Sequence, residues 1–468
     1  MTSTEPRLAR SPGLTYQDLL DADTHPVPEV LRLESPRFLG DSDIPKERYT
    51  SREWHRREVD RLWMRVWQFA CREEHIPNVG DYIVYDIAGL SFVVIRTESG
   101  IKAYPNACLH RGRRLKDYDG HCSEIRCAFH GFTWAIDGEL ASVPAAWDFP
   151  HVDQRPDDFH LPECKVGTWA GFVFINPDRD AQPLEEFVGE LDGQMAVWDL
   201  ENRYVEAHVS KVIRANWKIT QEAFCEAYHV GGTHPQILPY LGDTNSQVDV
   251  WDTFSRVITP GGTPSPLLPW EPTEEEMLRS MLDVRVDQET PLPLAEGQTA
   301  RAVAAAAARE RWRKVVGERV DRMSDSEMMD SLDYTLFPNL HPWGAFNRIV
   351  YRFRPNGDDH RSSIMEVLFL SPFEGERPPP APVHVLGPDE PWVEAPELGM
   401  LAKVFEQDTF NMANIQLGLE TTFKPGITLG NYQESKVRWL HQLLGECVDG
   451  PEDRGVDGDV SEQQVRVR

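Results

Sequence analysis

Apolar and polar residues alternate in two different ways along the chain. Between residues 80 and 176, short apolar runs repeat with a period of two and are separated by Gly and Asp: YIVYDI, LSFVVIRT, GFTWAI and GFVFIN. This pattern is typical of the strands of a small β-sandwich. Residues 50–68, just before it, have the i, i+3, i+4 spacing of an amphipathic helix. The first half of the chain therefore predicts a helix followed by an all-β domain.

After Pro177 the pattern changes to long helical stretches that alternate with the strands NRIVYRFRP and SIMEVLFLSP. Residues 299–322 predict an Ala- and Arg-rich helix, and the proline-rich residues 371–397 predict a loop. We therefore expect an α+β protein with four segments. They are an N-terminal extended arm (1–48), a β-sandwich domain with its leading helix (49–176), a second, larger domain (177–447) and a disordered acidic tail (448–468).

Two pairs of Cys and His lie in loops of the β-rich segment, Cys108-Leu109-His110 and Cys127-Ala128-Phe129-His130. The spacing C-x-H and C-x-x-H suits a Rieske [2Fe–2S] cluster, in which two His bind one iron and two Cys bind the other. A tetrahedral zinc ion uses the same residue types, but C-x-H is an unusual zinc hairpin. We favour the cluster because a second metal motif, which such a cluster would supply with electrons, follows downstream.

The second motif lies between residues 216 and 234. On a regular helix Glu222, Glu226 and His229 share one face. His234 follows His229 by five residues, which places the two side chains about 140° apart on such a helix. We expect the intervening Gly231-Gly232 to unwind the turn so that the two imidazoles meet. The alternative is a solvated acidic face that carries one isolated His.

A third candidate ligand lies far downstream, in residues 401–419. Asp408 falls inside the apolar stripe of this predicted helix. The stripe consists of Leu401, Val404, Phe405, Met412, Ile415 and Leu419. A buried carboxylate is costly unless it is paired or binds a metal. Two His and one carboxylate form the facial triad of non-haem Fe(II) enzymes, whereas the alternative is an ion pair with a buried Arg or Lys.

Composition narrows the functional class. The 468 residues carry a net charge of -28, which disfavours nucleic acid and anionic membranes as partners. Seven Cys, an odd number, fit a reducing cytoplasm. Residues 1–20 lack the apolar core of a signal peptide, and no apolar run approaches the length of a membrane helix. We therefore expect a cytoplasmic protein that does not enter membranes.

Together these motifs resemble the large (α) subunit of Rieske non-haem iron ring-hydroxylating oxygenases. The resemblance spans about residues 45–445 and rests on C-L-H-R-G, C-A-F-H-G-F, N-W-K-x3-E…E-A-Y-H-V-G-G-T-H and Q-D-T-F-N-M. It implies a Rieske domain joined to a helix-grip catalytic domain with a central antiparallel sheet. The cofactors it implies are a [2Fe–2S] Rieske cluster and mononuclear non-haem Fe(II).

The resemblance also implies residue roles. It implies two ligand sets, the cluster ligands Cys108, His110, Cys127 and His130 and the iron ligands His229, His234 and Asp408. Glu226 would link the iron site to His130 of a neighbouring subunit, so that a homotrimer, with or without a small β subunit (α3β3), is implied. Many relatives have Asp where this chain has Glu226, and Asn where it has Ala223. Tyr228 is a candidate for lining the route or the pocket, and equally for packing in the core.

The chain has no G-x-G-x-x-G after a strand and no P-loop, so we expect electrons from a separate ferredoxin, flavin reductase or both. The expected function is a terminal oxygenase that uses O2 to hydroxylate a hydrophobic, aromatic substrate by dihydroxylation or monooxygenation. Oxidative demethylation or hydroxylation of a non-aromatic substrate is the alternative, and an electron-transfer Rieske protein is a remote one. Four cations follow the cluster loop: Arg111, Arg113, Arg114 and Lys116. They either attract an acidic carrier, or they satisfy buried carbonyl groups or pair with acids across the subunit contact.

Overall fold

The computed structural model describes residues 13–284, 288 and 290–450. Within them the chain forms two compact units. Unit 1 comprises residues 13–54, 190–353 and 360–445, and unit 2 comprises residues 55–189, 354–359 and 446–450. Almost all of the predicted acidic tail, residues 451–468, lies outside the described residues.

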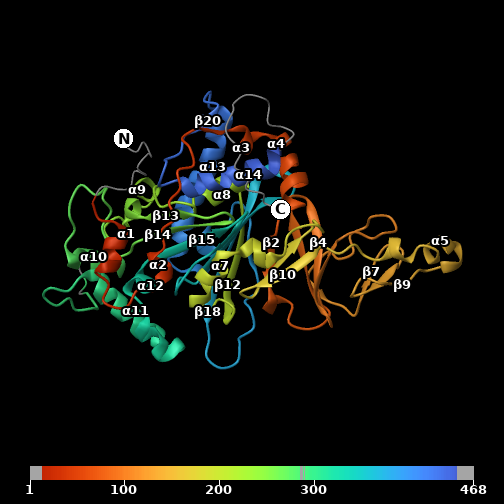
Figure 1. Ribbon diagram of the computed structural model, residues 1–468, viewed down its shortest axis with the longest axis horizontal. Coiled ribbons are helices and arrows are strands. Elements are labelled where there is room, and N and C mark those ends of the chain that lie inside the picture. Colours follow the sequence, from red (N-terminus) through yellow and green to blue (C-terminus); the bar gives the residue numbers. More distant parts are fainter. Residues whose placement is uncertain (1–12, 285–287, 289, 451–468) are drawn as a thin grey trace, which may run out of the picture. The chain divides into compact units, whose positions relative to one another are not determined.

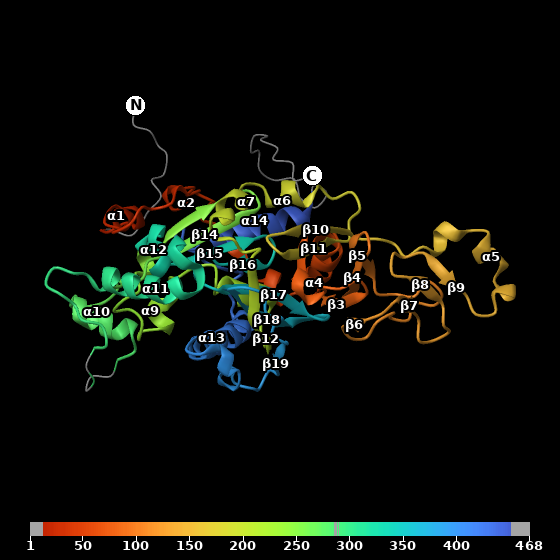
Figure 2. The same ribbon diagram turned by 90° about the horizontal axis from the view of Figure 1, so that it is seen from below.

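Unit 2 consists of three small antiparallel sheets. Their orders are β10-β11-β2, β5-β4-β3-β6 and β7-β8-β9. The strands are β2 (Gln68–Arg72), β3 (Asp81–Ile87), β4 (Leu90–Thr97), β5 (Gly100–Pro105), β6 (Gly120–His121), β7 (Glu124–Arg126), β8 (Thr133–Ala135), β9 (Leu140–Ser142), β10 (Lys165–Trp169) and β11 (Phe172–Asn176). The four predicted apolar runs form β3, β4, β8 and β11. Figures 1 and 2 show the third sheet and α5 (Pro150–Asp153) together at one end of this unit, away from β2 and β10.

Unit 1 is built around an eight-stranded sheet with the order β13-β14-β15-β16-β17-β18-β12-β19. Its strands are β12 (Arg203–Ile213), β13 (Gln247–Val250), β14 (Phe254–Thr259), β15 (Ser331–Leu336), β16 (Leu340–Pro342), β17 (Ile349–Asn356), β18 (Asp359–Pro372) and β19 (His384–Leu386). The predicted central antiparallel sheet is confirmed, with one difference at its edge. The short strand β19 pairs parallel with β12, in a segment for which the prolines predicted only a loop.

Helices cover the sheet and fill the connections. They are α1 (Tyr16–Asp21), α2 (Glu29–Arg32), α3 (Glu47–Thr50), α4 (Arg52–Glu58), α6 (Leu184–Val188), α7 (Glu190–Met195), α8 (Trp217–Glu222), α9 (Val230–Thr233), α10 (Glu274–Met281), α11 (Ala300–Val316), α12 (Asp325–Met329), α13 (Leu401–Thr421) and α14 (Ser435–Asp449). A two-stranded ladder joins β1 (Ile44–Pro45) to β20 (Gly426–Ile427). The predicted helices over residues 50–68 and 299–322 correspond to α4 and α11.

The main core of unit 1 lies between α13 and one face of the sheet. Every second residue of β12, β17 and β18 points to this face, as the pleat of a strand requires, and Val209, Tyr351 and Val367 are examples. Phe405 and Met412 of α13 pack against them. In Figures 1 and 2, α14 lies over the same face toward β15, where Lys436 pairs with Asp333 at 2.9 Å. The core thus fixes α13 directly beside α8.

The N-terminal segment is not the extended arm that its prolines predict. From Thr15 onward it packs along unit 1 through α1 and α2, because Tyr16 and Leu31 are buried there. The guanidinium group of Arg256 donates hydrogen bonds to the carbonyl oxygens of Val30 and Leu33 at 2.8 Å each. Arg256 also pairs with Asp249 at 2.6 Å, and both side chains are fully buried.

We expect Asp249→Ala to lower the free energy of unfolding by about 3–5 kcal/mol, because it leaves the Arg256 guanidinium buried without a counter-charge. The exposed pair Arg37–Asp252 serves as a control, and Asp252→Ala should cost at most about 1 kcal/mol. Urea denaturation followed by tryptophan fluorescence measures both. Equal stabilities of the two variants would show that the buried pair does not hold the N-terminal segment.

Candidate functional site

The two Cys–His pairs lie on two loops with the same backbone geometry. In the first loop, the N–H of Gly112 donates to the carbonyl oxygen of Cys108 at 2.8 Å, and in the second, the N–H of Gly131 donates to that of Cys127 at 3.1 Å. Both glycines have positive φ, +76° and +80°, which side chains disfavour. Each loop therefore turns back on its Cys and projects its His.

The four side chains gather as two pairs and not around one point. The ring centroids of His110 and His130 are 4.7 Å apart. Burial raises the pKa of the Cys108 thiol above its usual value. The backbone N–H of His110 lowers this pKa, and the hydrogen-bonded thiol of Cys127 raises it, so that the net shift is upward. Two thiols inside and two imidazoles beside them suit a cluster with two irons.

A single zinc ion fits this arrangement poorly. Zinc bond lengths imply ligand atoms about 3.5 Å apart from one another. Among the described residues, the one group of three or more candidate ligand atoms that all lie within 4.8 Å of one another is elsewhere, in unit 1. The geometry therefore favours the [2Fe–2S] alternative.

The imidazoles lie at the surface of unit 2 and the thiols inside it. Cys108 and Cys127 are buried, His110 is half-buried and His130 is exposed. Phe129, whose ring centroid lies 3.8 Å from that of His130, is 59% exposed. The imidazole end of such a cluster is therefore the end that faces the surface of unit 2.

The four cations after the first loop are mostly engaged within unit 2. Arg113 pairs with Asp117 at 2.6 Å, and Arg114 pairs with Asp86 at 2.8 Å. Both arginines thus have acidic partners within unit 2 itself, rather than across a subunit contact. Arg111 lies over the ring of Phe129, and Lys116 over that of Tyr82.

The second motif does not form the single helix that its periodicity predicts. Helix α8 begins after Asn216, whose side chain accepts a hydrogen bond from the N–H of Lys218, and it ends at Glu222. A separate single-turn helix, α9, contains Gly231-Gly232 and is flanked by His229 and His234. The expectation that the glycines unwind the helix is therefore wrong. A Cβ at Gly231 would lie 2.8 Å from Leu267 Cδ1, at the end of an exposed side chain that can move aside.

The structure brings the three predicted iron ligands together. Asp408 Oδ1 lies 2.8 Å from His234 Nε2 and 3.5 Å from His229 Nε2. Asp408 is 4% exposed on α13, in the buried stripe that includes Phe405 and Met412. Ile415, which we placed in the same stripe, is 47% exposed, because the buried positions continue through Gln416 instead.

Each imidazole is held from behind by a second side chain. Glu226 Oε1 lies 2.8 Å from His229 Nδ1, and its Oε2 accepts the backbone N–H of His229 at 2.9 Å. Gln407 Oε1 lies 3.0 Å from His234 Nδ1. These contacts leave both Nε2 atoms directed at Asp408, as metal-binding histidines require. The sequence did not predict that Gln407 orients His234. The one feature of the sequence that could have indicated this role is the position of Gln407 next to Asp408.

The electrostatics of the site favour a cation. Burial alone lowers the pKa of His229, but Glu226 and Asp408 outweigh burial and raise it to about 10. Burial raises the pKa of Asp408, but the two imidazoles outweigh it and lower that pKa below its usual value. The two nitrogens and one carboxylate oxygen, surrounded by negative charge, fit Fe(II). Tyr228 is 54% exposed, so the interpretation of it as a core residue is wrong.

Comparison with known proteins agrees with this geometry. Residues 197–450 match the family model of the ring hydroxylating alpha subunit (catalytic domain), and residues 66–153 match that of the Rieske [2Fe-2S] domain. The chain belongs to the ring-hydroxylating α-subunit family. Its cofactors are therefore a [2Fe–2S] cluster and a mononuclear iron, as the resemblance implied.

The curated relatives of this chain include a biphenyl dioxygenase subunit and a glycine betaine monooxygenase subunit. The biphenyl 2,3-dioxygenase subunit alpha of Rhodococcus jostii is 31% identical over 193 residues, 40% of this chain and 42% of the relative. The glycine betaine monooxygenase oxygenase subunit of Chromohalobacter salexigens is 29% identical over 228 residues, 47% of this chain and 48% of the relative. The matched regions thus span about half the length of these relatives.

Solved structures share the fold of this α subunit. A quaternary ammonium Rieske monooxygenase, CntA, in complex with L-carnitine aligns with a TM-score of 0.59 and 16% identity over 86% of this chain and 95% of that one. Naphthalene 1,2-dioxygenase from Rhodococcus sp., bound to indole, aligns with a TM-score of 0.58 and 21% identity over 87% of this chain and 95% of that one. The described part of the α subunit contains no helix with the length and apolarity needed to cross a membrane.

We expect His234→Ala to lose the mononuclear iron and to keep the cluster, because it removes one of three ligands in unit 1 and leaves unit 2 unchanged. Iron and sulfide content and the visible spectrum of the cluster measure both outcomes. The control is Gln236→Ala, since Gln236 is exposed and contacts Gln407 rather than the ligands. Full iron content in His234→Ala would exclude the assigned site.

Proposed function

We propose that this chain is the terminal oxygenase component of a multi-component system. It takes electrons from a separate ferredoxin or flavin reductase and uses O2 to hydroxylate a hydrophobic organic substrate. The observation that carries this proposal is the presence, in one chain, of a Rieske ligand set and of the triad of His229, His234 and Asp408. A protein that only carries electrons through a Rieske cluster would not require this triad.

Each residue of the triad site then has a defined task. The bound iron would supply O2 activation at coordination positions that three protein ligands leave open. Glu226 and Gln407 orient the two imidazoles. Phe224 packs between Tyr351 and Phe405, with ring centroids 4.8 and 6.1 Å away, and helps to exclude water from the core beside α13.

Two substrate classes follow from the relatives. Biphenyl 2,3-dioxygenase favours an aromatic hydrocarbon, which is our first choice. Relatives named for glycine betaine and carnitine favour a quaternary ammonium compound, for which the expected reaction is monooxygenation. Both classes need the same triad, so the wall of the substrate pocket distinguishes them.

We also propose that electrons pass between copies of the chain in a homotrimer, with or without a β subunit. His130 of one protomer would contact Glu226 of its neighbour. The exposed side chain of Phe129 beside His130 supports this arrangement, since an assembly would cover it. On unit 1, Phe410 and Phe423, near the helix that carries Asp408, are exposed as well, at 71% and 104%.

We expect Glu226→Gln to retain both metals but to slow oxidation of the reduced cluster in a single turnover by about tenfold or more, because it removes the charged bridge to His130. Stopped-flow absorbance of the cluster under O2 and substrate measures the rate. Glu420→Gln, the same change at an ion pair on α13, should react like the wild type. A wild-type rate in Glu226→Gln would remove this residue from the electron route.

The reaction itself is tested with a substrate panel under ¹⁸O2 and a surrogate reductase. Naphthalene and biphenyl represent the aromatic class, and carnitine and glycine betaine the quaternary ammonium class. Two labelled atoms per product indicate dihydroxylation, and one indicates monooxygenation. If the cluster passes electrons to a second carrier and no O2 is consumed with any substrate of the panel, the electron-transfer alternative is favoured. The same result would refute the proposed oxygenase function.

A further inference from the structure

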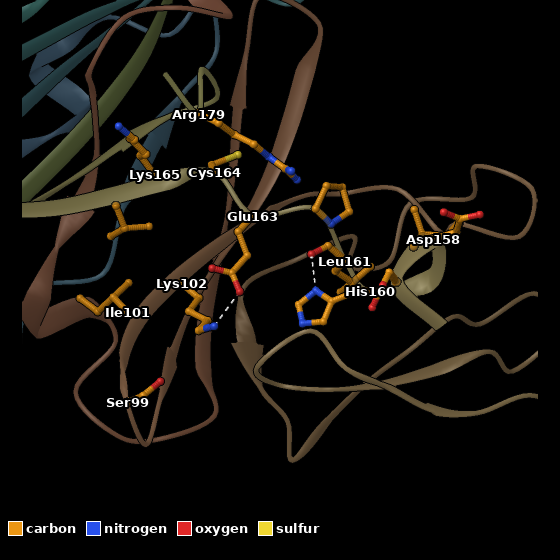
Figure 3. A pocket seen from close by; sticks show the side chains of 14 residues that line it. Ser99, Ile101, Lys102, Asp158, His160, Leu161, Glu163, Cys164, Lys165 and Arg179 are labelled. Atoms are coloured by element: carbon orange, nitrogen blue, oxygen red, sulfur yellow. Dashed lines mark hydrogen bonds and ion pairs between the residues drawn. The ribbon is translucent and has the colours of Figure 1, made fainter. Parts of the chain in front are cut away.

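Unit 2 contains an open pocket of about 760 Å³ that none of the metal ligands lines. Figure 3 shows its wall, which comes from segments far apart in the sequence. They are β5, Leu109 of the first cluster loop, the segment 157–163 and the start of β10, together with Arg179. The Rieske ligands and the substrate chemistry leave this pocket without a role.

The pocket reaches the first cluster loop. Leu109, in its wall, lies between Cys108 and His110. Leu161, also in the wall, is fully buried and belongs to the same apolar cluster as Cys108 and Cys127. A molecule seated in the pocket would therefore contact the ligand loop itself.

The charges of the pocket are separated into two ends. In the middle, Lys102 and Glu163 neutralise each other at 2.6 Å (Figure 3). One end carries acidic side chains, among them Asp158, which pairs with the exposed Arg155 at 3.3 Å. The other end carries Arg179 and Lys165 (Figure 3).

The basic end keeps its charge. Arg179 is exposed, and its guanidinium makes no hydrogen bond or ion pair within the described part of the chain. Lys165 donates to the carbonyl oxygen of Ala181, which leaves its charge unneutralised. In a chain of net charge -28, such a local positive site attracts and orients an anionic partner.

We propose that this pocket is the docking site at which an acidic electron-carrier protein, of the iron–sulfur or flavin type, reduces the Rieske cluster. The inference rests on the proposed function, which requires a separate electron donor. Carboxylates on a protruding loop of the carrier pair with Arg179 and Lys165. One electron leaves the reduced centre of the carrier and one enters the cluster, with no bond formed or broken. Electrons thus enter beside Leu109 of the first cluster loop.

The test uses the iron-loaded full chain and, as the probe, an acidic plant-type [2Fe–2S] ferredoxin. We expect Arg179→Glu to lower the second-order rate constant of cluster reduction, and the affinity for oxidised ferredoxin, by about tenfold or more at low salt. The difference between Arg179→Glu and the wild type should disappear at about 0.5 M NaCl, where the charges are screened. Arg65→Glu is the matched control, because Arg65 is an exposed arginine of the same unit that does not line the pocket.

A second variant tests the shape of the pocket. Ile101→Trp fills the pocket without changing its charge, so it should slow reduction by ferredoxin at both low and high salt. Chemical reduction with dithionite should be complete in every variant. Dithionite-reduced protein should still react with O2 and substrate as the wild type does, which separates docking from the oxygenase reaction.

Three results would each overturn the proposal. The first is wild-type reduction rates in both Arg179→Glu and Ile101→Trp. The second is a decrease of the reduction rate in Arg65→Glu that equals the decrease in Arg179→Glu, which would indicate a general effect of net charge. The third is a wild-type protein that dithionite reduces and the acidic ferredoxin does not.

Discussion

The buried carboxylate of Asp408 is the constraint on which the active site depends. It lies on the core-facing stripe of α13, among side chains that are otherwise mostly apolar. A carboxylate in such a place must be compensated, and the compensating groups are two imidazoles from a segment 174 residues away in the sequence. The α13 helix and the α9 turn are thereby held together by polar contacts at the edge of an apolar core. Without a metal, the same negative charge keeps a proton on His229, and with a metal it holds the cation.

The two ends of the Rieske site differ in the same physical way. The thiols are buried in an apolar shell, and the imidazoles lie at a surface with exposed aromatic side chains. This asymmetry gives the cluster an inner side and an outer side. The proposed entry of electrons beside Leu109 and their proposed exit at His130 use different residues of the two cluster loops. A single surface would have to serve the carrier and the neighbouring protomer in turn.

Charge has different roles in the two units. The overall charge of -28 would repel an acidic carrier. The cations that follow the first cluster loop do not remedy this, because Arg113 and Arg114 already have acidic partners. Arg179, which no sequence motif marks, keeps a free charge. Arg179 matters because no acidic side chain in the described part of the chain pairs with it, and only the folded structure shows this.

The sequence by itself predicted the cluster ligands, because each Cys–His pair is local and its short loop contains a glycine with positive φ. It also predicted the strands of both units and the burial of Asp408, since these follow from hydrophobic periodicity. It did not determine how His229 and His234 meet, because their imidazoles are positioned by Glu226, by Gln407 and by Asp408 of α13, far away in the sequence. The role of Gln407 and the charged pocket around Arg179 were likewise decided by tertiary structure. Both depend on side chains that come together only when distant segments fold, and no local pattern encodes such long-range contacts.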